Sequence, residues 1–315
     1  MKKLTILDGG MGRELKRMGA PFSQPLWSAQ TLIESPEFVY QAHNNFIHAG
    51  AEIIITNSYA CVPFHLGQKL YEQQGSELAR FAAQIARECA DKSPERVLVA
   101  GCIPPAFGSY RPDLFEPKLG EIISKTLFEA QEDYVDLWLA ETICSLEELK
   151  CLQRVFTSST KPTAYAFSLS DDSLETALLR SGETVIQAIE HIAQSADNTN
   201  TISVYFNCSV PEVMAKAVSD TKAVLDQHKL DIEIGVYANN FTAIKSNHEA
   251  NSALQAMREL SPKEYLTFAQ KWHRCGATII GGCCGIGPEH IKALSDWRHP
   301  FSSFIESHPR QSAHD

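Results

Sequence analysis

The stretch SPEFVYQAHNNFIHAGAEIIITN, residues 35–57, contains a complete helix-to-strand unit and decides how the rest of the chain is interpreted. Ser35 is suited to cap a helix, Pro36 to occupy its first turn and Gly50 to end it. The run EIIITN that follows is short and rich in β-branched residues, which is typical of a buried strand. The stretch therefore predicts a helix over 35–51 that leads directly into a strand.

The same alternation recurs along the whole chain, without a repeated sequence. The predicted strands are LTILD (4–8), EIIITN (52–57), RVLVAG (96–101), VDLWLAE (135–141), TAYAFS (163–168), TISVYFN (201–207), IEIGVYA (232–238) and ATIIGG (277–282). Further segments with a helical pattern are 75–92, 119–133, 181–196 and 261–277. Strands that alternate with helices indicate an α/β fold with a parallel sheet.

Eight such units in 315 residues predict a single (β/α)8 barrel of the TIM type. A doubly wound open sheet is the alternative, but the first turn lacks the G-x-G-x-x-G pattern of that fold. No Pro-, Ser- or Gly-rich linker divides the chain. We therefore expect one barrel domain over residues 1–300 and a polar tail over 301–315.

Composition narrows the partners and the compartment. The 28 basic and 38 acidic residues give a net charge of −10, which argues against nonspecific binding to nucleic acid. No apolar run approaches the ~20 residues of a membrane-spanning helix, and the N-terminus lacks the apolar segment of a secretory signal. We expect a cytoplasmic protein that binds neither nucleic acid nor membrane. Nothing in the pattern indicates an oligomeric state.

Polar residues and cysteines follow the predicted strands, at the end of the barrel where the active sites of this fold lie. They are Asp8, Asn57, Cys102, Glu141, Ser168, Cys208, Asn239, Cys283 and Cys284. If the barrel forms, these side chains share one pocket at the carboxyl ends of the strands.

The cysteines offer two interpretations. The chain has nine, an odd number, which favours reduced thiols over a disulfide framework. Cys208 follows the sixth predicted strand, and Cys283 and Cys284 follow the eighth, so three thiols could converge on a Zn²⁺ ion with a fourth position open. Flanking glycines permit the backbone bend that adjacent ligands need. Packing is the alternative, because free cysteine is commonly buried as a small hydrophobe.

Four motifs resemble the homocysteine S-methyltransferase family, from residue 4 to about residue 295. They are DGGMGREL (8–15), AGAEIIITNSYA (49–60), NC (207–208) and GGCCGIGPEHI (281–291). The family consists of zinc-dependent thiol methyltransferases on a (β/α)8 barrel. LWSA (26–29) is similar to the branch that uses S-methylmethionine or S-adenosylmethionine rather than betaine or a folate.

The resemblance implies a set of roles. Cys208, Cys283 and Cys284 would bind zinc. Asp8 and Glu141 would hold the ammonium of homocysteine, and the Gly9–Gly10 turn would offer N–H groups to its carboxylate. An aromatic face suits the fixed positive charge of a sulfonium donor, and the aromatic candidates in the first three loops are Trp27, Tyr59, Phe107 and Tyr110. Arg111 could bind a donor carboxylate or form a surface ion pair.

The chain departs from the family pattern in three loops. Ile286 and Gly287 replace two threonines after the paired cysteines. The loop after the seventh strand reads YANNF (237–241) and includes Asn239, and GCIPPAFGSYRPDLFEP (101–117) replaces a glycine- and proline-rich loop after the third. These positions fall on the donor side of the expected site.

The predicted function is methyl transfer from a sulfonium donor to homocysteine, forming methionine. Two alternatives keep the barrel. One changes the substrates, to another small thiol or selenol as acceptor or to betaine as donor. The other is a zinc- or thiol-binding protein without turnover.

Overall fold

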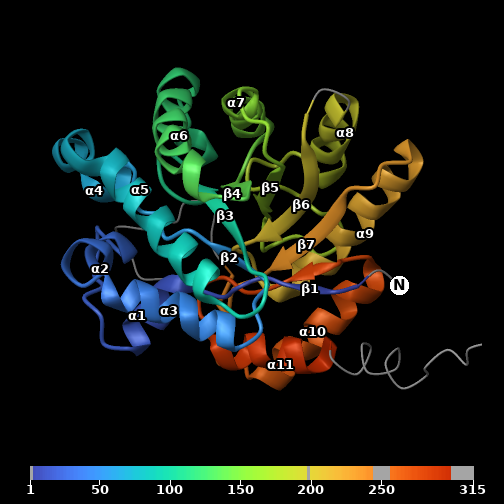
Figure 1. Cartoon of the computed structure of the whole chain (residues 1–315). Coiled ribbons are helices and arrows are strands. Elements are labelled where there is room, and N and C mark those ends of the chain that lie inside the picture. The colour runs from blue at the N-terminus through green and yellow to red at the C-terminus, as the bar shows by residue number, and fades with distance from the viewer. Residues whose placement is uncertain (1–2, 197–198, 244–255, 299–315) are drawn as a thin grey trace, which may run out of the picture.

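A closed eight-stranded barrel forms the centre of the molecule. The computed structural model describes residues 3–196, 199–243 and 256–298. Within these ranges all eight strands pair in parallel, in the order β1-β8-β7-β6-β5-β4-β3-β2. A further parallel bridge between Leu7 and Ile53 joins the two edges of the sheet, and helices surround it (Figure 1). The predicted single (β/α)8 barrel is confirmed, whereas the predicted tail over 301–315 lies outside the described residues.

The strands agree in place with those predicted: β1, β2, β7 and β8 are shorter, and β3 and β4 begin and end two residues later. They are β1 (Thr5–Ile6), β2 (Ile53–Ile55), β3 (Leu98–Ile103), β4 (Leu137–Ile143), β5 (Thr163–Ser168), β6 (Thr201–Asn207), β7 (Glu233–Tyr237) and β8 (Ile279–Ile280). The α-helices are α1 (Met11–Arg17), α2 (Ser28–Glu34), α3 (Glu37–His48), α4 (Pro63–Leu66), α5 (Gln68–Lys92), α6 (Pro117–Gln131), α7 (Leu146–Phe156), α8 (Val185–Ser195), α9 (Pro211–His228), α10 (Pro262–Cys275) and α11 (Pro288–Arg298). Two short 3-10 helices, η1 (Pro112–Leu114) and η2 (Glu132–Tyr134), flank α6.

Helix boundaries follow local chemistry, with one correction. Ser261 caps α10 in a reciprocal capping box with Glu264, and Gly276 ends that helix at a φ of 126°. The similar Ser-Pro pair at Ser35 does not cap α3: the Ser35 N–H instead donates to Thr31 and closes the last turn of α2. The predicted Ser35 cap is therefore wrong, because the preceding helix already uses that residue.

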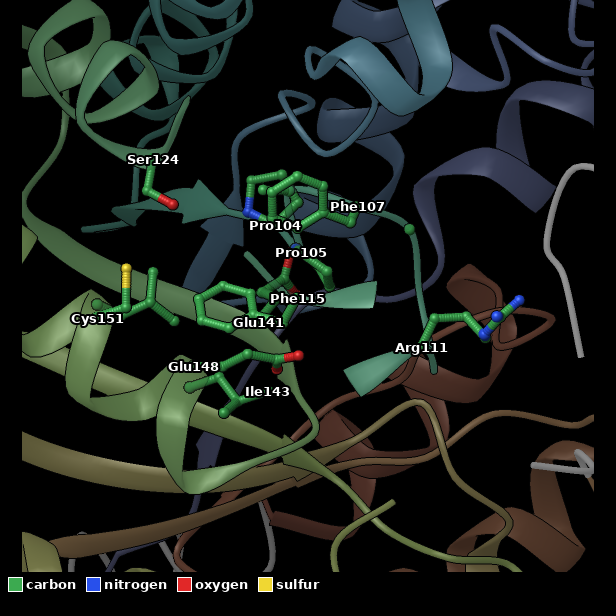
Figure 2. A pocket seen from close by; sticks show the side chains of 13 residues that line it. Pro104, Pro105, Phe107, Arg111, Phe115, Ser124, Glu141, Ile143, Glu148 and Cys151 are labelled. Atoms are coloured by element: carbon green, nitrogen blue, oxygen red, sulfur yellow. The ribbon is translucent and has the colours of Figure 1, made fainter. Parts of the chain in front are cut away.

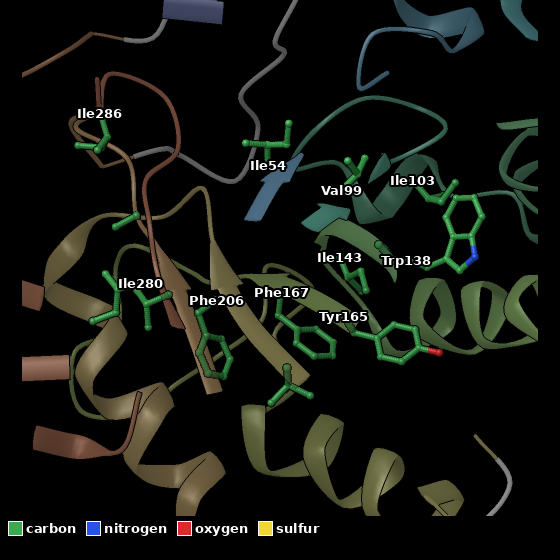
Figure 3. Packing of buried hydrophobic residues seen from close by; sticks show 14 of the residues in the cluster. Ile54, Val99, Ile103, Trp138, Ile143, Tyr165, Phe167, Phe206, Ile280 and Ile286 are labelled. Atoms are coloured by element: carbon green, nitrogen blue, oxygen red, sulfur yellow. The ribbon is translucent and has the colours of Figure 1, made fainter. Parts of the chain in front are cut away.

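Two apolar layers hold the barrel. Along β4, Leu137 and Leu139 point into the barrel interior with Ile53 of β2 and Tyr205 of β6. The residue between them, Trp138, packs outward against the helices with the larger core cluster (Figure 3). This alternation is the period of two expected of a strand buried on both faces. It leaves the strand ends to carry polar groups.

None of the helices in the described ranges combines the length and the apolar composition needed to cross a membrane.

Candidate active site

A pocket of about 230 Å³ opens at the carboxyl ends of the barrel strands. Its walls come from the loops after β1, β2, β3, β6, β7 and β8 and from the ends of β4 and β7. The residues predicted from the sequence that line it are Asp8, Gly9, Gly10, Trp27, Asn57, Tyr59, Tyr110, Glu141, Cys208, Cys283 and Cys284. Cys102 and Ser168, which were expected in the same pocket, do not line it. Residues more than 270 positions apart in the chain, from Asp8 to Cys284, thus meet in one cavity, as the barrel topology requires.

The three cysteines line one region of this pocket. Cys208 follows β6 with a φ of +48°, and it forms a disulfide with Cys283, across a Cα–Cα distance of 5.7 Å. Cys284 is free, and so are the six cysteines outside the pocket. The expectation of reduced thiols is therefore wrong for this pair, since the barrel brings the two sulfur atoms together. No three His, Cys, Asp or Glu residues in the described ranges are grouped so as to hold a metal.

Glycines let the loops after β1 and β8 meet backbone to backbone. The Gly282 N–H donates to the Asp8 carbonyl at 2.9 Å, and the Gly10 N–H donates to the Ile286 carbonyl at 2.8 Å. A Cβ on Gly10 would lie 2.4 Å from the Cys283 carbonyl oxygen, so no larger residue fits. This contact places Asp8 beside the cysteine loop. It also means that the Gly10 N–H already has an acceptor.

Two carboxyl groups lie buried at the floor of the pocket. Asp8 is 2% exposed; its Oδ2 accepts from the Ile55 N–H at 2.8 Å, while its Oδ1 has no hydrogen-bond partner in the described structure. Glu141 accepts from the Tyr237 hydroxyl at 2.9 Å and from the Cys102 thiol at 2.8 Å.

Burial raises the pKa of both carboxyls, and the charge of Glu141 adds to the rise at Asp8. Neither forms an ion pair within the described ranges. Desolvated anions without a counter-charge favour a cationic ligand.

Aromatic side chains also line the pocket. The Tyr59 hydroxyl lies 2.6 Å from Ser109 Oγ, and the rings of Phe22 and Trp27 meet edge to face at 5.5 Å. Tyr110 is buried with a φ of +68°, and the guanidinium carbon of Arg180 lies 4.6 Å from its ring centroid. One face of Tyr110 is thus already occupied by a cation.

The structure places three donor-side candidates elsewhere. Phe107 and Arg111 line a separate cavity of about 20 Å³, room for about one water molecule (Figure 2). Arg111 pairs there with Asp113 at 2.7 Å. Asn239 does not line the pocket; it accepts from the Phe241 N–H at 3.1 Å and shapes the loop after β7.

The small cavity meets the main pocket at Glu141, which lines both. Glu148 also lies on its wall, where burial raises the pKa of that carboxyl to about 7.

Several lining residues were missed from the sequence. The main ones are Arg13, Phe22, His65, Tyr237 and Phe241. Tyr237 could have been found, because it is the last residue but one of a predicted strand and begins the YANNF stretch. Arg13 lies inside the quoted DGGMGREL motif, but only the packing of α1 against the cysteine loop shows that it reaches the pocket.

Comparisons with known proteins show the family of the chain. Residues 5–297 match the family model described as homocysteine S-methyltransferase. Homocysteine S-methyltransferase 1 of Brassica oleracea var. italica is 28% identical over 92% of this chain and 92% of its own length. Selenocysteine methyltransferase of Astragalus bisulcatus is 27% identical over 93% of this chain and 91% of its own.

A crystal structure of the Escherichia coli homocysteine methyltransferase MmuM in its metallated form superposes with a TM-score of 0.76 and is 25% identical, covering 94% of this chain and 96% of that one. The oxidized form of MmuM gives a TM-score of 0.75 at 24% identity and 94% and 96% coverage. The barrel and its pocket thus define a thiol methyltransferase. The chain belongs to the homocysteine S-methyltransferase family, and homocysteine is the methyl acceptor that this family defines.

Proposed function

We propose that the chain transfers a methyl group from a sulfonium donor, S-methylmethionine or S-adenosylmethionine, to the thiol of L-homocysteine, with zinc as cofactor. The observation that carries the proposal is a pocket that combines three cysteine side chains with a buried carboxylate oxygen, Asp8 Oδ1, that lacks a partner in the described structure. Homocysteine offers the matching groups, a thiol and an ammonium.

The cysteines fit a zinc ion by their chemistry and their place. All three line one pocket, and two of their sulfur atoms already meet. Thiolates are the ligands that zinc prefers, and three protein ligands are the usual set of a catalytic site. When bound, zinc would lower the pKa of the acceptor thiol and orient its sulfur for attack. The site requires the reduced pair, which fits a reducing compartment such as the cytoplasm.

The residues of the chain would hold the two substrates. Asp8 Oδ1 would accept from the ammonium of homocysteine, with Glu141 as its second anion. Tyr237 fixes the Glu141 carboxylate through its hydroxyl. The Gly9–Gly10 turn would lie beside the amino-acid backbone of the substrate, with the Gly10 N–H committed to Ile286.

The aromatic wall formed by Trp27, Tyr59 and Tyr110 would face the sulfonium. In the transfer, the thiol loses its proton to solvent and forms an S–C bond to the methyl carbon. The methyl–sulfonium bond breaks and its electron pair returns to the donor sulfur, which leaves as a neutral thioether. The cation is consumed in this step, so a pocket of uncharged aromatic faces would not retain the product.

A selenol is a second candidate acceptor. It is favoured by the similarity to the Astragalus selenocysteine methyltransferase. Selenium is softer than sulfur and suits the same thiolate-rich site.

A metal assay combined with a donor screen tests the proposal. Reduced protein is expected to bind one zinc and to form methionine from homocysteine with S-methylmethionine or S-adenosylmethionine, but not with betaine. Cys208→Ser, Cys283→Ser and Cys284→Ser should each lose zinc and activity. Cys89→Ser and Cys151→Ser are the matched controls and should lose neither, because these free cysteines do not line the main pocket. The proposal would be contradicted if neither sulfonium donor yielded methionine. Full zinc content in Cys284→Ser would also contradict it.

A further inference from the structure

We propose that Arg13 of α1 binds the α-carboxylate of an amino-acid substrate in the pocket. The inference rests on the proposed function, because the α-carboxylate that Arg13 would bind belongs to homocysteine or to an amino-acid sulfonium donor.

Arg13 is a cation in the pocket, and no carboxylate of the described residues pairs with it. It is partly buried and lines the pocket together with Asp8 and Cys284. Its guanidinium carbon lies 6.0 Å from the centroid of the Phe241 ring, also a lining residue.

The neighbouring arginine shows the contrast. Arg17, one turn further along α1, makes two hydrogen bonds to Glu14, with its Nε at 2.8 Å and its Nη2 at 2.6 Å. Arg13 has no ion pair with an acidic residue in the described ranges. The helix therefore directs one guanidinium to a protein carboxylate and leaves the other facing the cavity.

An amino acid in this pocket would bring both charges of a zwitterion. Asp8 and Glu141 supply the anions for its ammonium, and the Gly10 N–H, a natural donor for its carboxylate, already bonds to Ile286. Among the lining residues of the described structure, Arg13 is the one lysine or arginine. A guanidinium presents two parallel N–H groups to a carboxylate, and this pairing is stronger than a neutral hydrogen bond.

Either substrate could supply the carboxylate, and decarboxylated analogues separate them. The acceptor arm compares homocysteine with 3-aminopropane-1-thiol. The donor arm compares S-methylmethionine with (3-aminopropyl)dimethylsulfonium. Each arm is run as steady-state kinetics on the zinc-loaded wild type, Arg13→Gln and Arg13→Lys. Lys16→Gln, an exposed neighbour on the same helix, is the matched control.

Arg13→Gln should lower kcat/KM about tenfold to a hundredfold for the carboxylated member of one pair and leave its decarboxylated partner unchanged. The loss should fall on KM rather than kcat, and Arg13→Lys should recover part of it. A loss in the acceptor arm assigns Arg13 to homocysteine, and a loss in the donor arm assigns it to the sulfonium. Equal losses for both members of each pair, or none, would overturn the inference.

Homocysteine binding measured by titration calorimetry separates this inference from the proposed function. If the wild type binds homocysteine but neither sulfonium donor methylates it, the proposed donor class is refuted. Weaker binding to Arg13→Gln would still support Arg13 in that case. Conversely, active enzyme with unchanged kinetics and binding in Arg13→Gln would overturn Arg13 alone.

Discussion

Replacing Asp8 with asparagine tests the assignment of the substrate ammonium most directly. The side chain keeps its size, and its Oδ1 can still accept from the Ile55 N–H that now bonds to Asp8 Oδ2. The amide nitrogen then occupies the position of the oxygen that has no partner in the described structure. A charged acceptor is thus exchanged for a neutral donor at the point where the ammonium would bind.

The magnitude follows from the bond that is lost. A hydrogen bond to a charged group contributes about 1.5–3 kcal/mol, which corresponds to roughly 10- to 150-fold in affinity. The upper part of this range is expected, because the new amide N–H groups point toward the ammonium. The fold should not suffer: Asp8 is 2% exposed, and a neutral group avoids the desolvation that raises its pKa.

The assay is homocysteine binding by calorimetry together with the homocysteine KM, and thermal denaturation monitors the fold. Asp136→Asn is the matched control, since Asp136 also accepts from a strand N–H, that of Val99 at 2.7 Å, but does not line the pocket. It should leave homocysteine affinity unchanged. A homocysteine KM within twofold of wild type in Asp8→Asn would refute the assignment.

Two further substitutions test the support of the site. Gly10→Ala brings a Cβ to 2.4 Å from the Cys283 carbonyl oxygen and should lower the free energy of unfolding by about 1–3 kcal/mol. Gly287→Ala is the control, because its new Cβ meets only the flexible end of the Glu289 side chain at 3.0 Å. Urea denaturation should show a larger loss of stability in Gly10→Ala than in Gly287→Ala. Tyr237→Phe removes the 2.9 Å hydrogen bond to Glu141 and should raise the homocysteine KM about tenfold at unchanged zinc content, so an unchanged KM would remove Tyr237 from substrate binding.

Of the pocket residues, those that directly follow the strands were the easiest to place from the sequence. In a parallel barrel the carboxyl ends of all strands meet, so Asp8, Glu141, Cys208 and Cys283 converge once the strands are placed. Their convergence needs no knowledge of loop conformation.

Residues on loops and helices were harder to place. Tyr110 and Arg111 are neighbours in the chain, yet Tyr110 lines the main pocket and Arg111 the small cavity. The φ of +68° at Tyr110 turns the backbone between them, and a non-glycine residue in that conformation is held by tertiary packing rather than by local preference. The position of Arg13 in the pocket also depends on tertiary packing, because it follows from how closely the glycines of the β1 and β8 loops approach each other.

The two buried carboxyls connect stability with binding. Burial is the main reason why the pKa of Glu141 is raised, and no cation within the described ranges pairs with this carboxyl to lower its pKa. A carboxyl whose pKa is higher in the folded than in the unfolded state makes the native protein bind more protons. The free energy of unfolding is then highest below the unfolded pKa and falls as pH rises through the folded one. The empty pocket therefore carries a stability cost at neutral pH that a bound ammonium would relieve.

Glu141→Gln should expose this cost in the metal-free protein. The amide keeps an acceptor for the Tyr237 hydroxyl but does not ionise, so the fall of stability with rising pH should be smaller than in wild type. The melting temperature of the variant minus that of wild type is expected to increase from pH 4 to pH 8, while homocysteine affinity decreases. A difference in melting temperature that stays constant over this range would show that Glu141 ionises equally well in the folded and unfolded chain. Its carboxylate would then have no unmet charge for a substrate ammonium to neutralise.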